Sequence, residues 1–241
     1  MAEILDKFGR RIQLSPVDEA IAQRVTETII EISRAGKTRE TAREIAISAF
    51  VWADHLVWRY ESESPLPRPI VCQAGCNFCC YNQVELTPPE ALSIGYYIDR
   101  NFSEDEKIKL LARVERSISL KSGKSKKEIG LIRRQLPCPL LRDKECGVYR
   151  VRPLLCRAMH SLDARQCELD LHSQSLTSFE YYLHRYEIIN SVIAGLQDGC
   201  QALGCQSRPV DLLKALKDFC QHERPAERWL RGEKIFSPLS P

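Results

Sequence analysis

The sequence predicts a mainly α-helical protein, in which a helical frame surrounds two irregular segments that carry cysteines. Apolar residues recur at helical spacing along most of the chain, and helix-capping residues precede several of these runs. Two cysteine blocks, at residues 72–80 and 138–167, interrupt this pattern. The 241 residues are enough for one compact domain with a substantial core.

Two helices are expected in residues 1–62, which should pack on the rest of the domain. The first begins after the pair Ser15-Pro16, carries apolar residues at four-residue spacing and ends at Gly36. The second begins near Thr38 and keeps a helical period of apolar residues. The polar, proline-rich stretch ESESPLPRP then predicts an extended connector.

Two more helices are expected between the cysteine blocks. Thr87 and Glu90 form a capping box, with Pro88 in the first turn. Ser103 and Glu106 form a second capping box. Each box precedes a run of apolar residues at helical spacing, so each is expected to start a helix.

The second cysteine block is punctuated by prolines and a glycine, and its PLL and GVY segments could form a small β-hairpin. After it, Thr177 and Glu180 form a capping box for a long helix that ends at Gly199, and a final amphipathic helix follows. We therefore expect a cysteine-bearing region at residues 63–170 and a C-terminal helical segment at residues 171–241.

Charge and hydropathy exclude several classes of function. The net charge of +3 is too small for the strongly basic face that nucleic-acid binding usually needs. The longest apolar-rich run, residues 45–53, is far shorter than the ~20 residues of a membrane span. The N-terminal residues lack the pattern of a secretory signal. We expect a cytoplasmic protein without a nucleic-acid or membrane partner.

The cysteines carry the chemistry of this chain. Clustered thiols in a reducing compartment are more often metal ligands than disulfides, and 11 cysteines are too few for a disulfide scaffold of this length. We therefore predict a metal site, with buried structural thiols as the alternative. The predicted ligands are the eight block cysteines, Cys72, Cys76, Cys79, Cys80, Cys138, Cys146, Cys156 and Cys167.

The first block contains one clear pair of ligands. In Cys76-x2-Cys79 the spacing lets both sulfurs approach one metal, and Cys72 can join them. Cys80 directly follows Cys79, and adjacent side chains tend to diverge. One of this pair is therefore expected to face a second metal, to bridge two metals or to remain a spare thiol, with a strained vicinal disulfide as the alternative.

The second block supplies its ligands singly, with spacers of seven, nine and ten residues. Zinc ribbons instead pair two CxxC motifs. Iron, as an iron–sulfur cluster, is therefore the first choice and zinc the alternative, and a single four-thiolate zinc built from both blocks stays open.

Four arginines and one histidine lie among these cysteines. The arginines could offset the negative charge of a thiolate centre, or pair with carboxylates such as Asp143, Glu145 and Asp163. The four are Arg142, Arg150, Arg152 and Arg157. His160 could be a ligand, but a packing or surface role is favoured.

The remaining cysteines lie outside both blocks. Cys200 and Cys205 are close together near the end of the predicted long helix, and Cys220 follows an apolar helix face. We expect all three to be small buried hydrophobic residues without a part in the metal site.

Taken together, the two blocks resemble the YkgJ-type cysteine-cluster family. The matching features are the core Gly75–Cys80, the TPPEA segment after it, CPLL at Cys138, CGVY at Cys146 and RPLLCR around Cys156. The resemblance covers about 40% of the chain, with one extra residue before Cys76 compared with the family pattern. It implies a zinc- or iron-chelating domain of CxxCxxCC type. Part of the family is similar to flagellin lysine N-methylases, which implies an iron–sulfur cluster.

The first block also resembles the cluster motif of radical S-adenosylmethionine enzymes, in Cys72-x3-Cys76-x2-Cys79. A β/α barrel should follow such a motif, but capped helices are predicted instead. No GxG loop of a conventional methyltransferase occurs in the sequence. An iron–sulfur enzyme that modifies a protein or peptide, by methyl transfer, is therefore kept as a second hypothesis, and a structural zinc module for protein interaction as a third.

Overall fold

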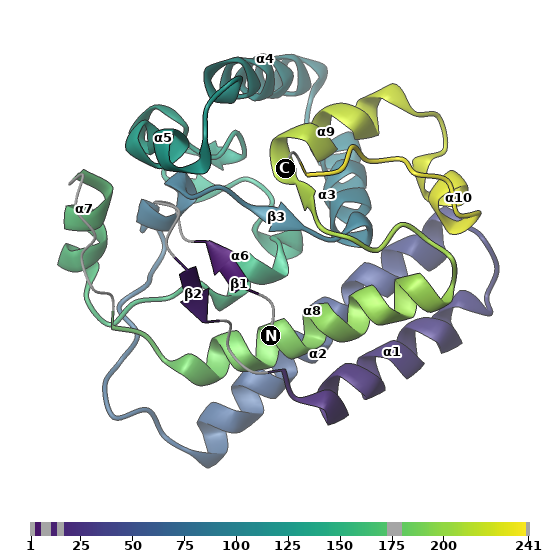
Figure 1. Cartoon of the computed structure of the whole chain (residues 1–241), viewed down its shortest axis with the longest axis horizontal. Coiled ribbons are helices and arrows are strands. Elements are labelled where there is room, and N and C mark those ends of the chain that lie inside the picture. The colour runs from purple at the N-terminus through teal and green to yellow at the C-terminus, as the bar shows by residue number, and fades with distance from the viewer. Residues whose placement is uncertain (1–2, 6–10, 14–16, 173–179, 240–241) are drawn as a thin grey trace.

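Helices make up most of the described chain, which confirms the predicted fold class (Figure 1). The computed structural model describes residues 3–5, 11–13, 17–172 and 180–239. Its α-helices are α1 (Glu19–Ser33), α2 (Arg39–Glu63), α3 (Pro88–Asn101), α4 (Glu104–Lys121), α5 (Lys126–Leu131), α6 (Leu154–Ala158), α7 (Ala164–His172), α8 (Leu183–Ala202), α9 (Leu212–Gln221) and α10 (Pro225–Leu230). Its 3₁₀ helices are η1 (Phe78–Tyr81), η2 (Arg133–Gln135) and η3 (Tyr149–Val151).

The strands of the described chain are short and form three two-stranded antiparallel sheets. They are β1 (Glu3–Leu5), β2 (Arg11–Gln13), β3 (Glu85–Leu86), β4 (Leu141–Arg142), β5 (Glu145–Cys146) and β6 (Val210–Asp211). The β4–β5 pair is the small hairpin that the sequence indicates in the second cysteine block. The β3–β6 pair joins the chain after the first block to the start of α9, with Leu86 opposite Val210.

Helices α1, α2 and α8 lie alongside one another on one side of the molecule (Figure 1). Glycines on α8 allow α1 to approach closely. A Cβ atom on Gly195 would lie 2.3 Å from the carbonyl oxygen of Ala22, and one on Gly199 would lie 2.8 Å from the Cβ of Ile29. These helices form a packed support for the irregular segments.

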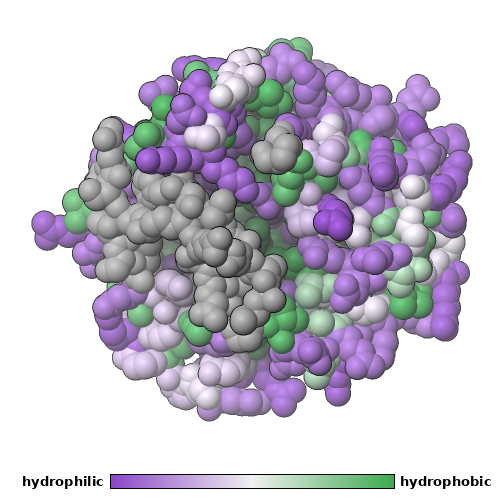
Figure 2. Space-filling view, viewed as in Figure 1, coloured by the Kyte–Doolittle hydropathy of each residue, from purple (hydrophilic) through white to green (hydrophobic). Residues whose placement is uncertain are grey.

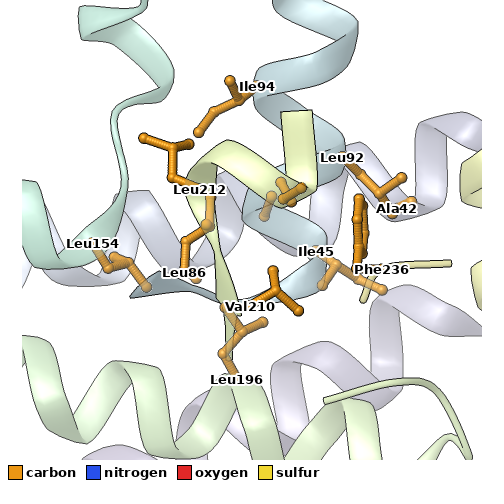
Figure 3. Packing of buried hydrophobic residues seen from close by; sticks show 14 of the residues in the cluster. Ala42, Ile45, Leu86, Leu92, Ile94, Leu154, Leu196, Val210, Leu212 and Phe236 are labelled. Carbon is orange, nitrogen blue, oxygen red and sulfur yellow. The ribbon is translucent and has the colours of Figure 1, made fainter. Parts of the chain in front are cut away.

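Buried apolar side chains from most of the helices form the core (Figure 3). Leu86 of β3, Leu154 of α6 and Val210 of β6 are among them, so elements next to both cysteine blocks are anchored in the interior. Burying such side chains is the main stabilising term in folding. Outside the grey atoms, hydrophilic residues predominate on the face drawn in Figure 2.

The capping boxes between the blocks are confirmed. Thr87 and Glu90 begin α3, and Ser103 and Glu106 begin α4, with both reciprocal contacts present in each box.

Within the described residues, none of the helices has the length and apolar character that crossing a membrane requires.

The predicted start of the first helix is too early. Ser15 and Pro16 lie outside the described residues, and α1 begins at Glu19. Asp18 is its N-cap, because its carboxylate accepts hydrogen bonds from the first-turn amides of Ala20 and Ile21, at 2.9 and 3.1 Å.

Both predicted ends of the long C-terminal helix are wrong. Thr177 lies outside the described residues, and α8 begins at Leu183 rather than at Glu180, whose carboxylate pairs with Arg68 on the loop after α2. The helix also continues through Gly199, because that glycine is where α8 meets α1 and is not a helix stop.

Candidate metal centre

The first cysteine block is a loop that leads into η1. Cys72 and Cys76 lie in the loop, where the Cys76 amide donates to the carbonyl of Gln73 at 3.0 Å. Gly75 has a φ of +83°, a conformation that residues with a Cβ rarely adopt, so the turn requires this glycine. Cys79 and Cys80 follow on η1.

The second block carries two of its cysteines on the β4–β5 hairpin. Cys138 precedes β4, and Cys146 lies on β5 opposite Leu141. The hairpin turn places Asp143 and Lys144 at φ values of +47° and +67°. Both thiols accept hydrogen bonds from the backbone: Cys138 from Leu140 and the next residue, and Cys146 from Val148. Both cysteines also pack against the core.

Cys156 lies on α6, which a buried carboxylate holds in place. Glu90 Oε1 accepts a hydrogen bond from the Leu154 amide at 2.7 Å, and its Oε2 accepts from the amide and hydroxyl of Thr87 at 2.7 and 2.6 Å. Burial raises the pKa of Glu90. The capping residue of α3, just after the first block, therefore also fixes the helix that carries Cys156.

Cys167 lies on α7, which is tied to the end of the first block. Arg133 donates to the Asp170 carboxylate on α7 at 2.5 Å and to the side-chain oxygen of Asn82 at 3.1 Å. Both members of the Arg133–Asp170 pair are buried. Breaking a buried ion pair is strongly destabilising, so this pair should hold α7 firmly beside η1.

Backbone hydrogen bonds join the two blocks at both ends of the first block. The Val71 amide donates to the Ser161 carbonyl at 3.1 Å, and the Cys138 amide donates to the Cys80 carbonyl at 2.7 Å. Ser161 also hydrogen-bonds two thiols, Cys72 through its backbone and Cys167 through its side chain. The fold thus brings cysteines that are far apart in the sequence into one region.

Within this region the thiols form two groups of neighbours. Burial, with a smaller contribution from the neighbouring thiols Cys146 and Cys79, raises the pKa of Cys138 to about 11. Burial also raises the pKa of Cys156, whose neighbours include the same three residues. We call this set the inner group. Its members are Cys138, Cys146 and Cys156.

The other set, the outer group, lies at the Ser161 end. Burial raises the pKa of Cys72, and its neighbours Cys76, Cys79 and Cys167 add to the effect. Burial likewise raises the pKa of Cys167, next to Cys76 and Cys79. Cys72 is exposed. The outer group consists of Cys72, Cys76 and Cys167.

Cys79 is a neighbour of both groups. Its thiol is hydrogen-bonded to Cys80, which raises its pKa, and burial raises that pKa further. The side chains of Cys79 and Cys80 are therefore in contact, whereas the sequence analysis expected them to diverge. All 11 cysteines lie in the described residues and are free thiols, so the vicinal disulfide is not formed.

The donors fit a soft metal by their chemistry. Thiolates are the preferred ligands of zinc and of iron–sulfur clusters. Among the described residues, no three His, Cys, Asp or Glu side chains are grouped closely enough to hold a metal ion. The thiols are thus neighbours in one region and do not form a closed coordination sphere.

One arginine faces the thiols with an unused donor. Arg152 lowers the pKa values of Cys79, Cys146 and Cys156 as a nearby positive charge, and its side chain stacks on Tyr149 at 4.3 Å. Among the described residues its Nε atom is buried with no hydrogen-bond partner. A buried N–H without a partner could donate a hydrogen bond to a thiolate ligand of a metal centre.

Two other arginines have carboxylate partners that the sequence did not suggest. Arg142 pairs with Glu106 on α4, and Arg157 pairs with Asp54 on α2. The predicted pairing with carboxylates inside the block is therefore wrong for both, because helices distant in the sequence supply the partners.

His160 has a packing role, as favoured. Its Nδ1 atom lies 2.7 Å from the Ala158 carbonyl, and its Nε2 atom accepts from the Tyr182 amide at 2.7 Å. Both ring nitrogens are therefore engaged by backbone groups. Burial lowers the pKa of this histidine, which favours the neutral ring.

The cysteines outside the blocks separate into buried and exposed. Cys200 and Cys205 are buried in the core, as predicted, whereas Cys220 is exposed, so its predicted burial is wrong. Cys220 lies near the end of α9, where the apolar face of that helix no longer covers it.

One residue near the thiols could not be found from the sequence. Tyr186 fits the apolar face of a long helix, but it lies next to Cys79 and to Cys72 and Cys167 of the outer group. Burial raises its pKa, and the nearby Tyr181, Cys79 and Cys72 raise it further. Its hydroxyl donates to the Met159 sulfur at 3.3 Å. No sequence signal distinguishes this tyrosine from an ordinary core residue.

These features define a helical protein with a thiol-rich region. Residues 71–182 match the CxxCxxCC family, which is described as a "putative zinc- or iron-chelating domain". The match confirms the predicted resemblance for this segment of the chain. No curated protein and no solved structure matches the chain.

Proposed function

We propose that the protein binds metal through its eight block cysteines, with iron as the first choice, in an iron–sulfur cluster, and zinc as the second. The observation that carries the proposal is the joining of the two blocks by the Val71–Ser161 and Cys138–Cys80 hydrogen bonds. These contacts bring together two sets of donors that are separated in the chain by about 60 residues, most of them helical.

The surroundings of the thiols support this role. Backbone amides already donate to Cys138 and Cys146, and such bonds stabilise a thiolate once its proton is displaced. The Arg152 guanidinium adds a positive charge on the same side. Since the buried thiols hold their protons strongly, metal binding releases protons, and the centre closes as the sulfurs are drawn together.

An enzyme is the second candidate function. The outer group lies at the surface, with Cys72 exposed, so a protein or peptide could reach a centre there. An iron–sulfur cluster, when bound, would supply redox chemistry or an open iron site. Methyl transfer to a protein or peptide is the candidate reaction.

Metal analysis of protein purified without oxygen tests the proposal. Brown protein that contains iron and sulfide supports the first choice, whereas colourless protein with stoichiometric zinc replaces it by the second. Cys76→Ser and Cys156→Ser should each lose metal, and Cys220→Ser, on α9 outside both blocks, should keep it. Equal metal content in all three variants would overturn the ligand assignment.

Calorimetry separates the two candidate functions. Binding of S-adenosylmethionine to the metal-loaded protein would support the enzyme. If the metal-loaded protein does not bind it, methyl transfer from S-adenosylmethionine is excluded and metal binding remains the proposed function.

A further inference from the structure

We propose that a cavity among α1, α2 and α8 binds an organic cation that is carried on an apolar stem. The cavity has a volume of about 480 Å³ and is open to solvent, and none of the described residues that line it is a cysteine. Cavities that bind small molecules commonly measure about 300–1,000 Å³ and combine an apolar lining with a few polar groups. This cavity has room for such a ligand, and its lining residues indicate the chemical class.

Part of the lining is apolar and belongs to the packed interior. Ile21 of α1, Leu56 of α2 and Ile188 of α8 line the cavity, and each is buried or half-buried. Ile21 and Leu56 also pack against the hydrophobic core, which fixes their positions. These side chains can cover the hydrocarbon stem of a ligand, and removing that stem from water favours binding.

The polar part of the lining is mainly acidic. Within the described residues, the Glu187 carboxylate has no hydrogen-bond or ion-pair partner. Among the same residues, the Asp18 carboxylate is engaged through Oδ1 alone, where it caps α1. The positive charge of Arg59, which also lines the cavity, is already paired with Glu63 at 2.9 Å. Two carboxylates can therefore receive a cation, whereas an anion would be repelled.

A buried serine holds these two acidic residues on their neighbouring helices. The Ser191 hydroxyl accepts from the Asp18 amide at 2.8 Å and donates to the Glu187 carbonyl at 2.6 Å. The start of α1 and the first turns of α8 are thus connected before any ligand binds. A site that is organised in advance loses less free energy to ordering when its ligand arrives.

Two rings complete the lining. Tyr60 of α2 stacks on His184 of α8, with ring centroids 4.4 Å apart and an interplanar angle of 21°. The Glu61 carboxylate holds this pair of helices together, because it accepts from Arg185 Nε at 2.6 Å and lies 2.9 Å from His184 Nε2. The face of an aromatic ring attracts cations, and a planar guanidinium can also stack on it.

A guanidinium on a short hydrocarbon stem suits all three parts of the lining. Its stem matches the apolar side chains, its plane matches the stacked rings, and its N–H groups can donate to a carboxylate. Two sources offer this group, a free alkylguanidinium compound and the arginine side chain of a peptide. The proposal concerns the group that they share, and it stands apart from metal binding by the cysteines.

Calorimetric titrations of the whole chain with three probes test the proposal. The probes are n-butylguanidinium, an Ala-Arg-Ala peptide blocked at both ends, and pentanol, which keeps an apolar stem without a charge. Binding of n-butylguanidinium but not of the peptide would support a free compound as the ligand, and tighter binding of the peptide would support a peptide. Binding of neither cation, or binding of pentanol as tight as that of n-butylguanidinium, would overturn the proposal.

Three variants locate the site. Glu187→Gln should weaken binding of n-butylguanidinium about 10-fold, as loss of a hydrogen bond to a charged group typically does. Tyr60→Leu should weaken it about 3-fold by removing the ring face. The matched control is Asp198→Asn, which removes an exposed carboxylate from α8 outside the cavity and should leave binding unchanged.

The same variants separate this site from the metal site. Circular dichroism checks that each is folded, and each should keep the wild-type metal content, because none of them alters a cysteine. Equal weakening of n-butylguanidinium binding by Glu187→Gln and Asp198→Asn would overturn the proposal, because the general charge of the protein would then explain the binding. Wild-type protein that binds n-butylguanidinium but neither iron nor zinc would overturn the proposed function and leave this site standing.

Discussion

The inner and outer cysteine groups occupy different surroundings, although both face Cys79. The inner thiols lie on a hairpin and a helix that pack on the core, and backbone amides and Arg152 point at them. The outer thiols lie on a surface loop and on α7, and their main partner is Ser161. The comparison indicates that folding itself positions the inner thiols, whereas the positions of the outer thiols depend on fewer and more exposed contacts.

The largest expected effect comes from Glu90→Ala, which should disturb the inner group through the fold. The buried amides of Thr87 and Leu154 would lose their acceptor, at a cost of about 3 kcal/mol in the free energy of unfolding. Urea denaturation measures this loss, and elemental analysis should show a lower metal content than in the wild-type protein.

The matched control is Glu128→Ala, which removes the corresponding carboxylate from the exposed capping box that begins α5. It should destabilise the protein much less and leave the metal content unchanged. Equal destabilisation by the two variants would show that the buried link between α3 and α6 has no special role.

The second effect is on metal affinity at the inner group. Arg152→Ala removes a guanidinium whose Nε atom is buried and should weaken metal binding there about 10- to 100-fold, as loss of an outer partner of metal ligands typically does. Competition with a chelator measures this.

Two further variants sharpen this result. Arg152→Lys keeps the charge but not the Nε donor, so it should recover affinity only in part. Arg150→Ala, an exposed arginine in the same block, should have no effect. If Arg150→Ala weakened binding as much as Arg152→Ala, general charge rather than the buried donor would be responsible.

The next prediction concerns the loop that carries Cys72 and Cys76 of the outer group. Gly75→Ala forces a residue with a Cβ into positive φ, at a cost of about 1–2 kcal/mol, without any steric contact within 4 Å. The metal content should fall. Gly36→Ala imposes the same backbone strain in the α1–α2 turn, so it should cost similar stability but no metal. Metal loss in both variants would attribute the effect to global destabilisation.

The contrast also explains what the sequence could and could not predict. The helix starts at Thr87 and Ser103 follow from contacts between residues three apart, so their patterns are visible in the sequence. The hairpin is local for the same reason. The grouping of the thiols depends on bonds such as Val71–Ser161, which join residues far apart in the chain.

The arginines illustrate the same limit. Arg142, Arg152 and Arg157 look alike in the sequence, but only the structure shows which of them have carboxylate partners on distant helices. The start of α8 could not be predicted from the sequence either. A capping box is expected at Glu180, but this residue pairs with Arg68 instead. Local capping signals therefore predicted helices well only where tertiary contacts did not compete for the capping residue.

The smallest expected effect concerns His160, which lies on the segment that joins the two groups. Its Nε2 atom accepts from the Tyr182 amide only while the ring is neutral, and burial lowers its pKa. As pH falls below the unfolded value of about 6.5, the unfolded state binds a proton before the folded state, so stability falls until the folded pKa is also passed. His160→Gln should cost about 1 kcal/mol at neutral pH by weakening these bonds, and should remove this part of the pH dependence. Urea denaturation of both proteins between pH 5 and pH 8 measures it. Identical slopes for the two proteins would show that His160 does not contribute to the pH dependence of stability.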